Sequence, residues 1–167
     1  MAVREILQLG NPQLYMKSKP VERSELDSVR QIAEDLNDTM VAFRDKYGFG
    51  RGIAAPQIGV MKRIIYTHTA RPLVLINPEL HDLSDETYAL WDNCMSFPDL
   101  LVKVKRYKTC STQFLNLDGE LVTYQLDGDA AELLQHECDH LDGILAVQRA
   151  IDSKSIALRS QKDWLVV

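Results

Sequence analysis

Cysteine is scarce in the 167-residue chain, and its distribution does not fit a disulfide framework. The three cysteines, Cys94, Cys110 and Cys138, are odd in number and lie far apart in the sequence. Small secreted domains that depend on disulfides carry more cysteines, usually in even sets. The sequence therefore indicates free thiols in a reducing compartment, and we expect a cytoplasmic protein.

Long apolar runs and an excess of positive charge are missing too. No stretch reaches the roughly 18 consecutive apolar residues that a membrane-spanning helix requires. The 24 acidic side chains outnumber the 19 Lys and Arg side chains, which gives a net charge of −5. A surface of this sign favours neither nucleic acid nor an anionic bilayer as a partner. We therefore expect no direct nucleic-acid site and no membrane contact.

Internal repeats, low-complexity tracts and flexible linkers are absent as well, so nothing in the sequence marks a boundary between domains. With 46% hydrophobic residues, a chain of this length can bury a substantial core. Residues 1–167 are therefore predicted to form a single domain.

The first regular element in the sequence is an amphipathic helix. Ser24 is suited to cap it, with Asp27 as the reciprocal partner. From Val29 to Phe43, apolar residues recur at the spacing of one helical face, and Gly48 ends the pattern. The following residues 48–59, GFGRGIAAPQIG, contain four glycines and a proline, so we expect an irregular loop there.

Strands are predicted where β-branched and aromatic residues cluster. These runs are residues 63–67, 73–76, 101–107, 112–117 and 121–126. Asp118 and Gly119 form the signature of a tight turn between the last two runs, which predicts a hairpin. The sheet is therefore expected to be largely antiparallel.

A second helix follows the predicted hairpin. Asp129 and Glu132 are spaced as a capping box, and leucines continue the pattern up to Gly143. Strands followed by one apolar helix, without regular βαβ alternation, indicate an α+β fold. We expect largely antiparallel sheets packed around this central helix, which we also expect to bind a metal.

The metal prediction comes from the segment QHECDHLDG, residues 135–143. His136 and His140 are four positions apart, so both imidazoles can face one ion from the same side of a helix. Glu137 lies about 100° further round, where a general base for an activated water belongs. Two histidines also occur at this spacing by chance, but buried imidazoles and a buried carboxylate need partners.

A tetrahedral ion needs a third protein ligand, which the downstream sequence does not supply. In the pattern HExxHxxGxxH a histidine would stand at position 146, which is Ala146, and no glutamate follows Glu137. Upstream candidates include His68, His81, Cys94, Cys110 and several carboxylates. Cys94 is favoured because apolar and polar residues alternate around it in WDNCMSFPDL, although a buried thiol that binds nothing fits the sequence equally well.

Three segments together resemble the peptide deformylases. They are residues 50–59 (GRGIAAPQIG), 92–96 (DNCMS) and 135–143 (QHECDHLDG), in the order of that family's three motifs. The resemblance covers nearly the whole chain. It implies a metal-dependent hydrolase that removes the N-formyl group from the N-terminal methionine of nascent polypeptides. N-formylmethionyl peptides would be its partners, with a transient encounter with the ribosome.

The resemblance also implies roles for individual residues. Cys94, His136 and His140 would bind one divalent ion, usually Fe²⁺, with Zn²⁺, Ni²⁺ or Co²⁺ as substitutes. Glu137 would move protons, while the Gln57 amide and the Met95 backbone N–H would stabilise charge on the formyl oxygen. The substrate-binding residues would be Gly50, Arg51, Gly52 and Leu133. A relative that acts on another acylated amide, or one that only binds metal or peptide, is the alternative.

The second motif departs from the usual Glu-Gly-Cys-Leu-Ser of that family. Asp92 is one methylene shorter than glutamate, which leaves open whether it reaches the metal ligands. Asn93 replaces a glycine, so we expect a turn that asparagine tolerates. Arg51 stands where the family is usually apolar, which predicts an altered preference for the residues after methionine. The sequence leaves open whether residues 162–167 form a strand.

Overall fold

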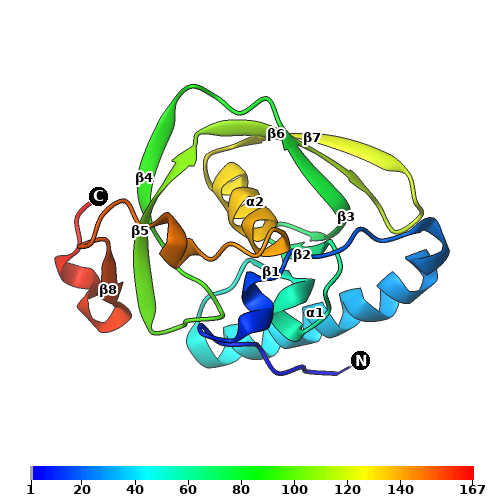
Figure 1. The fold of residues 1–167 in the computed structure, drawn as a ribbon, viewed down its shortest axis with the longest axis horizontal. Helices are drawn as coiled ribbons and strands as arrows, with labels where there is room; N and C mark the ends of the chain where they lie inside the picture. Colours follow the sequence, from blue (N-terminus) through cyan, green and yellow to red (C-terminus); the bar gives the residue numbers. More distant parts are fainter. Residues whose placement is uncertain (1) are drawn as a thin grey trace.

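Helix α2 (Gly128–Leu141) runs through the middle of the molecule, with β3, β6 and β7 on one side and β4 and β5 on the other (Figure 1). The structure is a computed structural model that describes residues 2–167. Its strands are β1 (Gly52–Ala54), β2 (Ile64–His68), β3 (Pro72–His81), β4 (Thr87–Asp92), β5 (Leu100–Tyr107), β6 (Thr109–Leu115), β7 (Leu121–Asp127) and β8 (Ile156–Leu158).

These strands form one sheet in the order β1-β2-β3-β6-β7 and a second in the order β4-β5-β8. Every neighbouring pair of strands in both sheets is antiparallel. Because the two sheets flank one buried helix, the predicted α+β arrangement is confirmed. Between residues 2 and 167, no helix combines the length and the apolar character that a bilayer crossing requires.

Helix α1 (Leu26–Tyr47) begins later than the sequence predicts. The Glu22 backbone N–H donates to the Glu25 side chain at 2.7 Å, and this bond closes a short 3₁₀ turn at Arg23–Glu25. Ser24 lies inside that turn, so the prediction that it caps the helix with Asp27 was wrong. The other end agrees with the sequence, because Gly48 adopts a left-handed conformation with φ of 78°.

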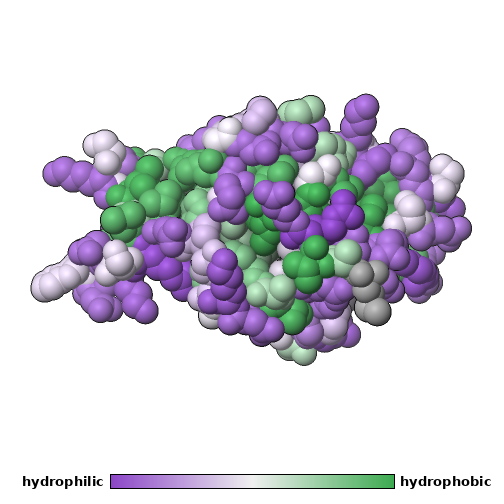
Figure 2. All heavy atoms as spheres, turned by 90° about the horizontal axis from the view of Figure 1, so that it is seen from below, coloured by the Kyte–Doolittle hydropathy of each residue, from purple (hydrophilic) through white to green (hydrophobic). Residues whose placement is uncertain are grey.

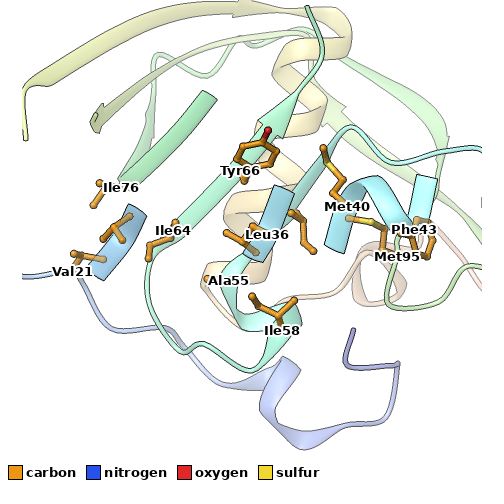
Figure 3. Close-up of a cluster of buried hydrophobic side chains, with 12 residues drawn as sticks. Val21, Leu36, Met40, Phe43, Ala55, Ile58, Ile64, Tyr66, Ile76 and Met95 are labelled. Atoms are coloured by element: carbon orange, nitrogen blue, oxygen red, sulfur yellow. The ribbon is translucent and has the colours of Figure 1, made fainter. Parts of the chain in front are cut away.

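The buried face of α1 packs against the larger sheet (Figure 3). Leu36 and Met40 are completely buried and point toward Ile64 and Tyr66 of β2. Met95, which follows β4, lies in the same cluster beside Phe43. Burial of each large apolar side chain contributes about 1.5–3 kcal/mol. The cluster therefore ties the segment after β4 to the rest of the core.

All five predicted strands are present, and the structure contains three further strands that the sequence does not reveal. The β6–β7 hairpin pairs Leu115 with Leu121, and Gly119 in its turn has φ of 76°, which confirms the predicted turn. The unpredicted strands are β1, β4 and β8. The expected irregular loop at residues 48–59 was wrong in part, because β1 and the 3₁₀ helix Ala55–Ile58 lie within it.

Every residue of helix α2 from Ala131 to Leu141 is buried. It begins at Gly128, with Asp127 as its N-cap, so the predicted capping box of Asp129 and Glu132 was wrong. The Glu132 side chain is instead paired with Arg51.

The end of α2 lies close to an N-terminal segment of the chain. Gly143 has φ of 73°, and a Cβ atom there would lie 2.5 Å from the Tyr15 carbonyl oxygen. Only glycine therefore permits the close contact at this end of the helix.

The C-terminal residues lie against the smaller sheet. Strand β8 pairs with β5, and a 3₁₀ helix covers Arg159–Trp164. The Trp91 indole N–H and the Lys103 ammonium group both donate to the Val166 carbonyl oxygen, at 3.0 and 3.1 Å. Hydrophilic side chains cover much of the face seen in Figure 2, with apolar groups between them, as is usual for a folded domain.

Candidate metal centre and active site

Three buried side chains from two distant segments meet beside α2. His136 and His140 lie on one face of this helix, and their Nε2 atoms are 3.2 Å apart. The Cys94 sulfur, just beyond the end of β4, lies 3.3 Å from the His140 Nε2 atom. All three ligand atoms lie within 4.8 Å of one another. The structure thus brings together the two histidines and the cysteine that the sequence favours as the third ligand.

The spacing of these atoms suits one divalent cation. At ordinary tetrahedral bond lengths, two imidazole nitrogens are about 3.3 Å apart, and a thiolate sulfur and a nitrogen are about 3.5 Å apart. The His136–His140 and Cys94–His140 distances are close to these values. Three protein ligands also leave one tetrahedral position for water or substrate, which is typical of catalytic metal sites.

Asp92 orients one of the two histidines. Its Oδ2 atom lies 2.8 Å from the His136 Nδ1 atom, so Nδ1 carries a hydrogen and Nε2 presents its lone pair to the centre. Burial opposes ionisation of Asp92. In the metal-free protein, the charge and hydrogen bond of protonated His136, together with those of Arg106, outweigh burial and lower the Asp92 pKa to about 2. The shorter aspartate therefore does reach the ligand, which answers the question that the sequence leaves open.

A buried chain of charges extends from Asp92 away from the centre. The Arg106 guanidinium binds Asp92 at 3.3 Å and Asp139 at 2.6 Å, and all three side chains are largely buried. Arg149 binds both carboxylate oxygens of Asp139, at 2.9 and 2.6 Å. Each buried carboxylate in this chain is thus paired, as a stable interior requires.

Glu137 is buried next to the centre without a fixed partner for one of its oxygens. Among the described residues, no group forms a hydrogen bond with its Oε2 atom. Burial raises the pKa of Glu137 to about 7. The side chain lies directly against Gly52, where a Cβ atom would come within 2.8 Å of the Glu137 Oε1 atom. Gly52 therefore provides the space that this carboxylate occupies.

Gln57 is held in one orientation beside Cys94. Its Oε1 atom accepts a hydrogen bond from the Ala54 N–H at 2.9 Å. Its Nε2 atom donates to the Ser96 hydroxyl at 3.1 Å and to the Cys94 sulfur at 3.6 Å. The bond from Ala54 fixes which end of the amide faces the centre, so the amide donors point toward the metal ligands.

Met95 follows Cys94 and has its side chain in the core. Within residues 2–167, its backbone N–H forms no hydrogen bond with another protein group. Its sulfur limits the space beside Gly50, which has φ of 129°.

Asn93 is not among the residues with positive φ in the described part of the chain. The turn that we expected asparagine to tolerate is therefore not needed there.

A cavity of about 460 Å³ opens beside the centre. Its walls include nine of the ten predicted site residues, namely Gly50, Arg51, Gly52, Gln57, Cys94, Met95, Leu133, His136 and Glu137. The tenth, His140, is completely enclosed. Glu132 and Arg44 also line the cavity, and neither was predicted from the sequence to belong to the site. Glu132 lies four residues before His136, and this helical spacing was the signal in the sequence that could have placed Glu132 at the site.

Comparison with known proteins identifies the family to which this arrangement belongs. The family model described as "Polypeptide deformylase" matches residues 3–155. The chain belongs to the peptide deformylase family. As a member, it is a hydrolase that removes the N-formyl group from the N-terminal methionine of nascent polypeptides, and the family requires a divalent metal.

Curated deformylases resemble the chain over most of its length. Peptide deformylase 1 of Prochlorococcus marinus is 37% identical, over 96% of this chain and 88% of that protein. The peptide deformylase of Dictyoglomus thermophilum is 39% identical, over 90% of this chain and 94% of that protein. The similarity therefore includes all three motifs.

Solved deformylase structures have the same fold. The Thermotoga maritima peptide deformylase matches with a TM-score of 0.84 and 32% identity, over 91% of this chain and 100% of that chain. A Met-Ala-Ser-bound peptide deformylase from Acinetobacter baumannii matches with a TM-score of 0.82 and 32% identity, over 89% and 98% of the two chains. These deformylase structures therefore share the fold of about nine-tenths of this chain.

Proposed function

We propose that Cys94, His136 and His140 hold one divalent ion, Fe²⁺ in the cell, and that the enzyme acts on N-formylmethionyl peptides. The observation that carries the proposal is the convergence of one sulfur and two Nε2 atoms at the wall of an open cavity. Thiolate and imidazole ligands also accept Zn²⁺, Ni²⁺ and Co²⁺, so the ion bound depends on supply. When bound, the ion acidifies a water and polarises the formyl carbonyl.

Glu137 is proposed as the group that moves protons. Its Oε2 atom is buried, faces the cavity wall and has no partner among the described residues. It accepts a proton from the attacking water and then delivers that proton to the leaving amine. Gly52 keeps the carboxylate in place, because any larger residue would contact its Oε1 atom.

Gln57 and the Met95 N–H are proposed to stabilise the oxygen of the formyl group as charge develops on it. Ala54 fixes the orientation of the Gln57 amide, whose Nε2 atom now donates to Ser96 and to the Cys94 sulfur. The Met95 N–H has no competing acceptor in residues 2–167. Donors that need not reorganise during the reaction contribute most to the rate.

The free edge of β1 is proposed to bind the peptide backbone. The His68 N–H donates to the Arg51 carbonyl oxygen at 2.9 Å, and Gly52 is aligned with Thr67 in the antiparallel pair. Because hydrogen-bonded and non-bonded pairs alternate, the Gly52 N–H and C=O point away from β2. They are available to an added strand, while Leu133 contributes apolar surface to the same cavity.

The proposal extends to the setting of the reaction. Residues 1–167 act as one catalytic domain in the cytoplasm, where the enzyme meets formylated chains as they leave the ribosome. The Met-Ala-Ser peptide bound to the Acinetobacter baumannii enzyme supports a substrate with methionine at its first position. No nucleic acid or membrane takes part.

The test is an anaerobic purification followed by metal analysis and an activity assay. We expect about one divalent ion per chain and release of a free amine from formyl-Met-Ala-Ser, but not from acetyl-Met-Ala-Ser. Release from the acetyl peptide at a similar rate would favour the broader amidohydrolase. No release by an iron- or nickel-loaded sample would contradict the proposal.

A further inference from the structure

An ion pair lies in the wall of the active-site cavity. The Arg51 guanidinium binds the Glu132 Oε1 atom, and its NH1 atom also lies 3.5 Å from the Asp129 carbonyl oxygen. The Glu132 side chain is 4% exposed and that of Arg51 is 46% exposed. Both residues line the cavity that contains Cys94 and His136. The buried carboxylate is thus covered by a guanidinium that still faces the open space.

The position of this pair in the cavity relates it to the substrate. Glu132 and Leu133 lie one helical turn before His136 and Glu137, on the same face of α2. When the formyl carbon lies beside Glu137 and Gln57, the first side chain of the peptide lies within about one helical turn of α2 from that carbon. That side chain therefore meets Leu133 and the Arg51–Glu132 pair. This step rests on the proposed function, because it requires the formyl group to lie at the metal centre.

The chemistry of the pair favours a side chain that accepts hydrogen bonds. A guanidinium has five N–H donors, and the bonds to Glu132 and Asp129 leave donors of Arg51 for the cavity. An apolar side chain laid over these donors would remove their water without replacing its hydrogen bonds. A side chain that ends in a carbonyl oxygen would replace them.

We propose that Arg51 and Glu132 determine specificity for the first residue of the substrate. The enzyme prefers formyl peptides whose first side chain is long, unbranched and ends in a hydrogen-bond acceptor over those with an apolar side chain of the same length. A formyl peptide that begins with methionine, whose thioether is a weak acceptor, should have a kcat/KM between those of these two kinds of peptide.

The experiment compares formyl-Gln-Ala-Ser with formyl-norleucine-Ala-Ser, using the metal-loaded enzyme. These first side chains have similar length and differ in their polar end. We expect a higher kcat/KM for the glutamine peptide. Calorimetry with the unformylated peptides Gln-Ala-Ser and norleucine-Ala-Ser gives a second measurement that does not depend on turnover, and we expect the same order of affinity.

The double variant Arg51→Met, Glu132→Leu tests the residues themselves. Both members are replaced together, because removal of one would leave the other charge buried and unpaired. The ratio of kcat/KM between the glutamine and norleucine peptides is expected to fall by about tenfold or more. The matched control is Lys62→Met, Glu25→Gln, which removes an ion pair of 2.6 Å outside the cavity and should leave the ratio unchanged.

Two results would overturn the inference: a wild-type enzyme whose kcat/KM for the norleucine peptide equals or exceeds that for the glutamine peptide, or a folded double variant with an unchanged ratio. If circular dichroism shows that the double variant does not fold, the wild-type ratio decides. Failure of the proposed function would be distinct, because no formyl peptide would then be hydrolysed, including formyl-Met-Ala-Ser. In that case the order of affinities for the unformylated peptides still decides the inference.

Discussion

The Asp92 carboxylate accepts a hydrogen bond from the Nδ1 atom of His136, at 2.8 Å. This contact connects a residue at the end of β4 with a proposed metal ligand on α2, 44 positions later in the chain. A partner of this kind fixes the imidazole orientation and increases its basicity. Asp92 would therefore act on a bound metal through His136.

The first prediction concerns this contact. Asp92→Ala should weaken metal affinity by about 10–100-fold, the usual effect of losing such a partner. Competition with a chelator measures the change. Asp92→Glu is the matched variant, because it keeps the carboxylate and should retain metal better than the alanine variant. Unchanged affinity in Asp92→Ala would mean that the contact does not support the ligand.

The second prediction separates the three cysteines. Cys94→Ser should reduce metal affinity by more than about 100-fold, beyond the loss expected from a supporting residue. Cys110→Ala should retain one ion per chain, since Cys110 is buried in β6 away from the centre. Elemental analysis after gel filtration gives the metal content of each variant. A fully loaded Cys94→Ser enzyme would rule out sulfur as a required ligand.

The third prediction concerns the proton-transfer role of Glu137. Glu137→Gln keeps the size of the side chain against Gly52 but cannot accept the proton, so kcat should fall by about 10²–10⁴-fold. Metal content should remain at the wild-type value, because Glu137 is not one of the three clustered ligands. If kcat stayed near wild type, another group would have to move the proton.

The fourth prediction uses the close contact at Gly52. Gly52→Ala would place a Cβ atom 2.8 Å from the Glu137 Oε1 atom and displace the carboxylate. A misplacement of about 1 Å costs on the order of 100-fold in rate, so we expect kcat to fall by that amount with metal retained. In Gly10→Ala, the new Cβ meets nothing within 4 Å, although φ of 102° strains the backbone, so stability should fall while kcat is unchanged. Equal kcat values in the two variants would show that a Cβ atom at position 52 does not displace the Glu137 carboxylate.

Much of the fold could be predicted from local sequence signals. The β6–β7 hairpin follows from its apolar runs and from the Asp118-Gly119 turn. Strand β4 was missed because its residues from Thr87 to Trp91 are all partly buried. Its sequence therefore lacks the alternation of apolar and polar residues that identifies a strand with one buried face. Strand β1 has three residues, including Gly52, and it depends on pairing with β2. Such a strand is specified by tertiary contacts rather than by its own composition.

The site could be predicted where a motif is contiguous, and it was missed where distant charges meet. His136, Glu137 and His140 are evident from their helical spacing. Glu132 has the residue type of a capping partner, but its actual partner, Arg51, lies 81 positions away. Only the folded chain brings these two side chains together. The polar character of the cavity wall was therefore not visible in either segment alone.

The last prediction concerns the buried arginine behind the metal centre. Arg106 is 3% exposed and binds both Asp92 and Asp139, so Arg106→Met would leave two buried carboxylates without their shared cation. Breaking a buried pair in this way costs about 3–5 kcal/mol, which urea unfolding of the metal-free protein would measure. Arg149 also binds Asp139, but its side chain is 44% exposed, so Arg149→Met should cost about 1 kcal/mol or less. Similar losses of unfolding free energy in the two variants would show that burial does not determine how much Arg106 contributes to stability. In the metal-loaded protein, Arg106→Met should also weaken metal affinity, because Asp92 would lose one of the two groups, after His136, that lower its pKa.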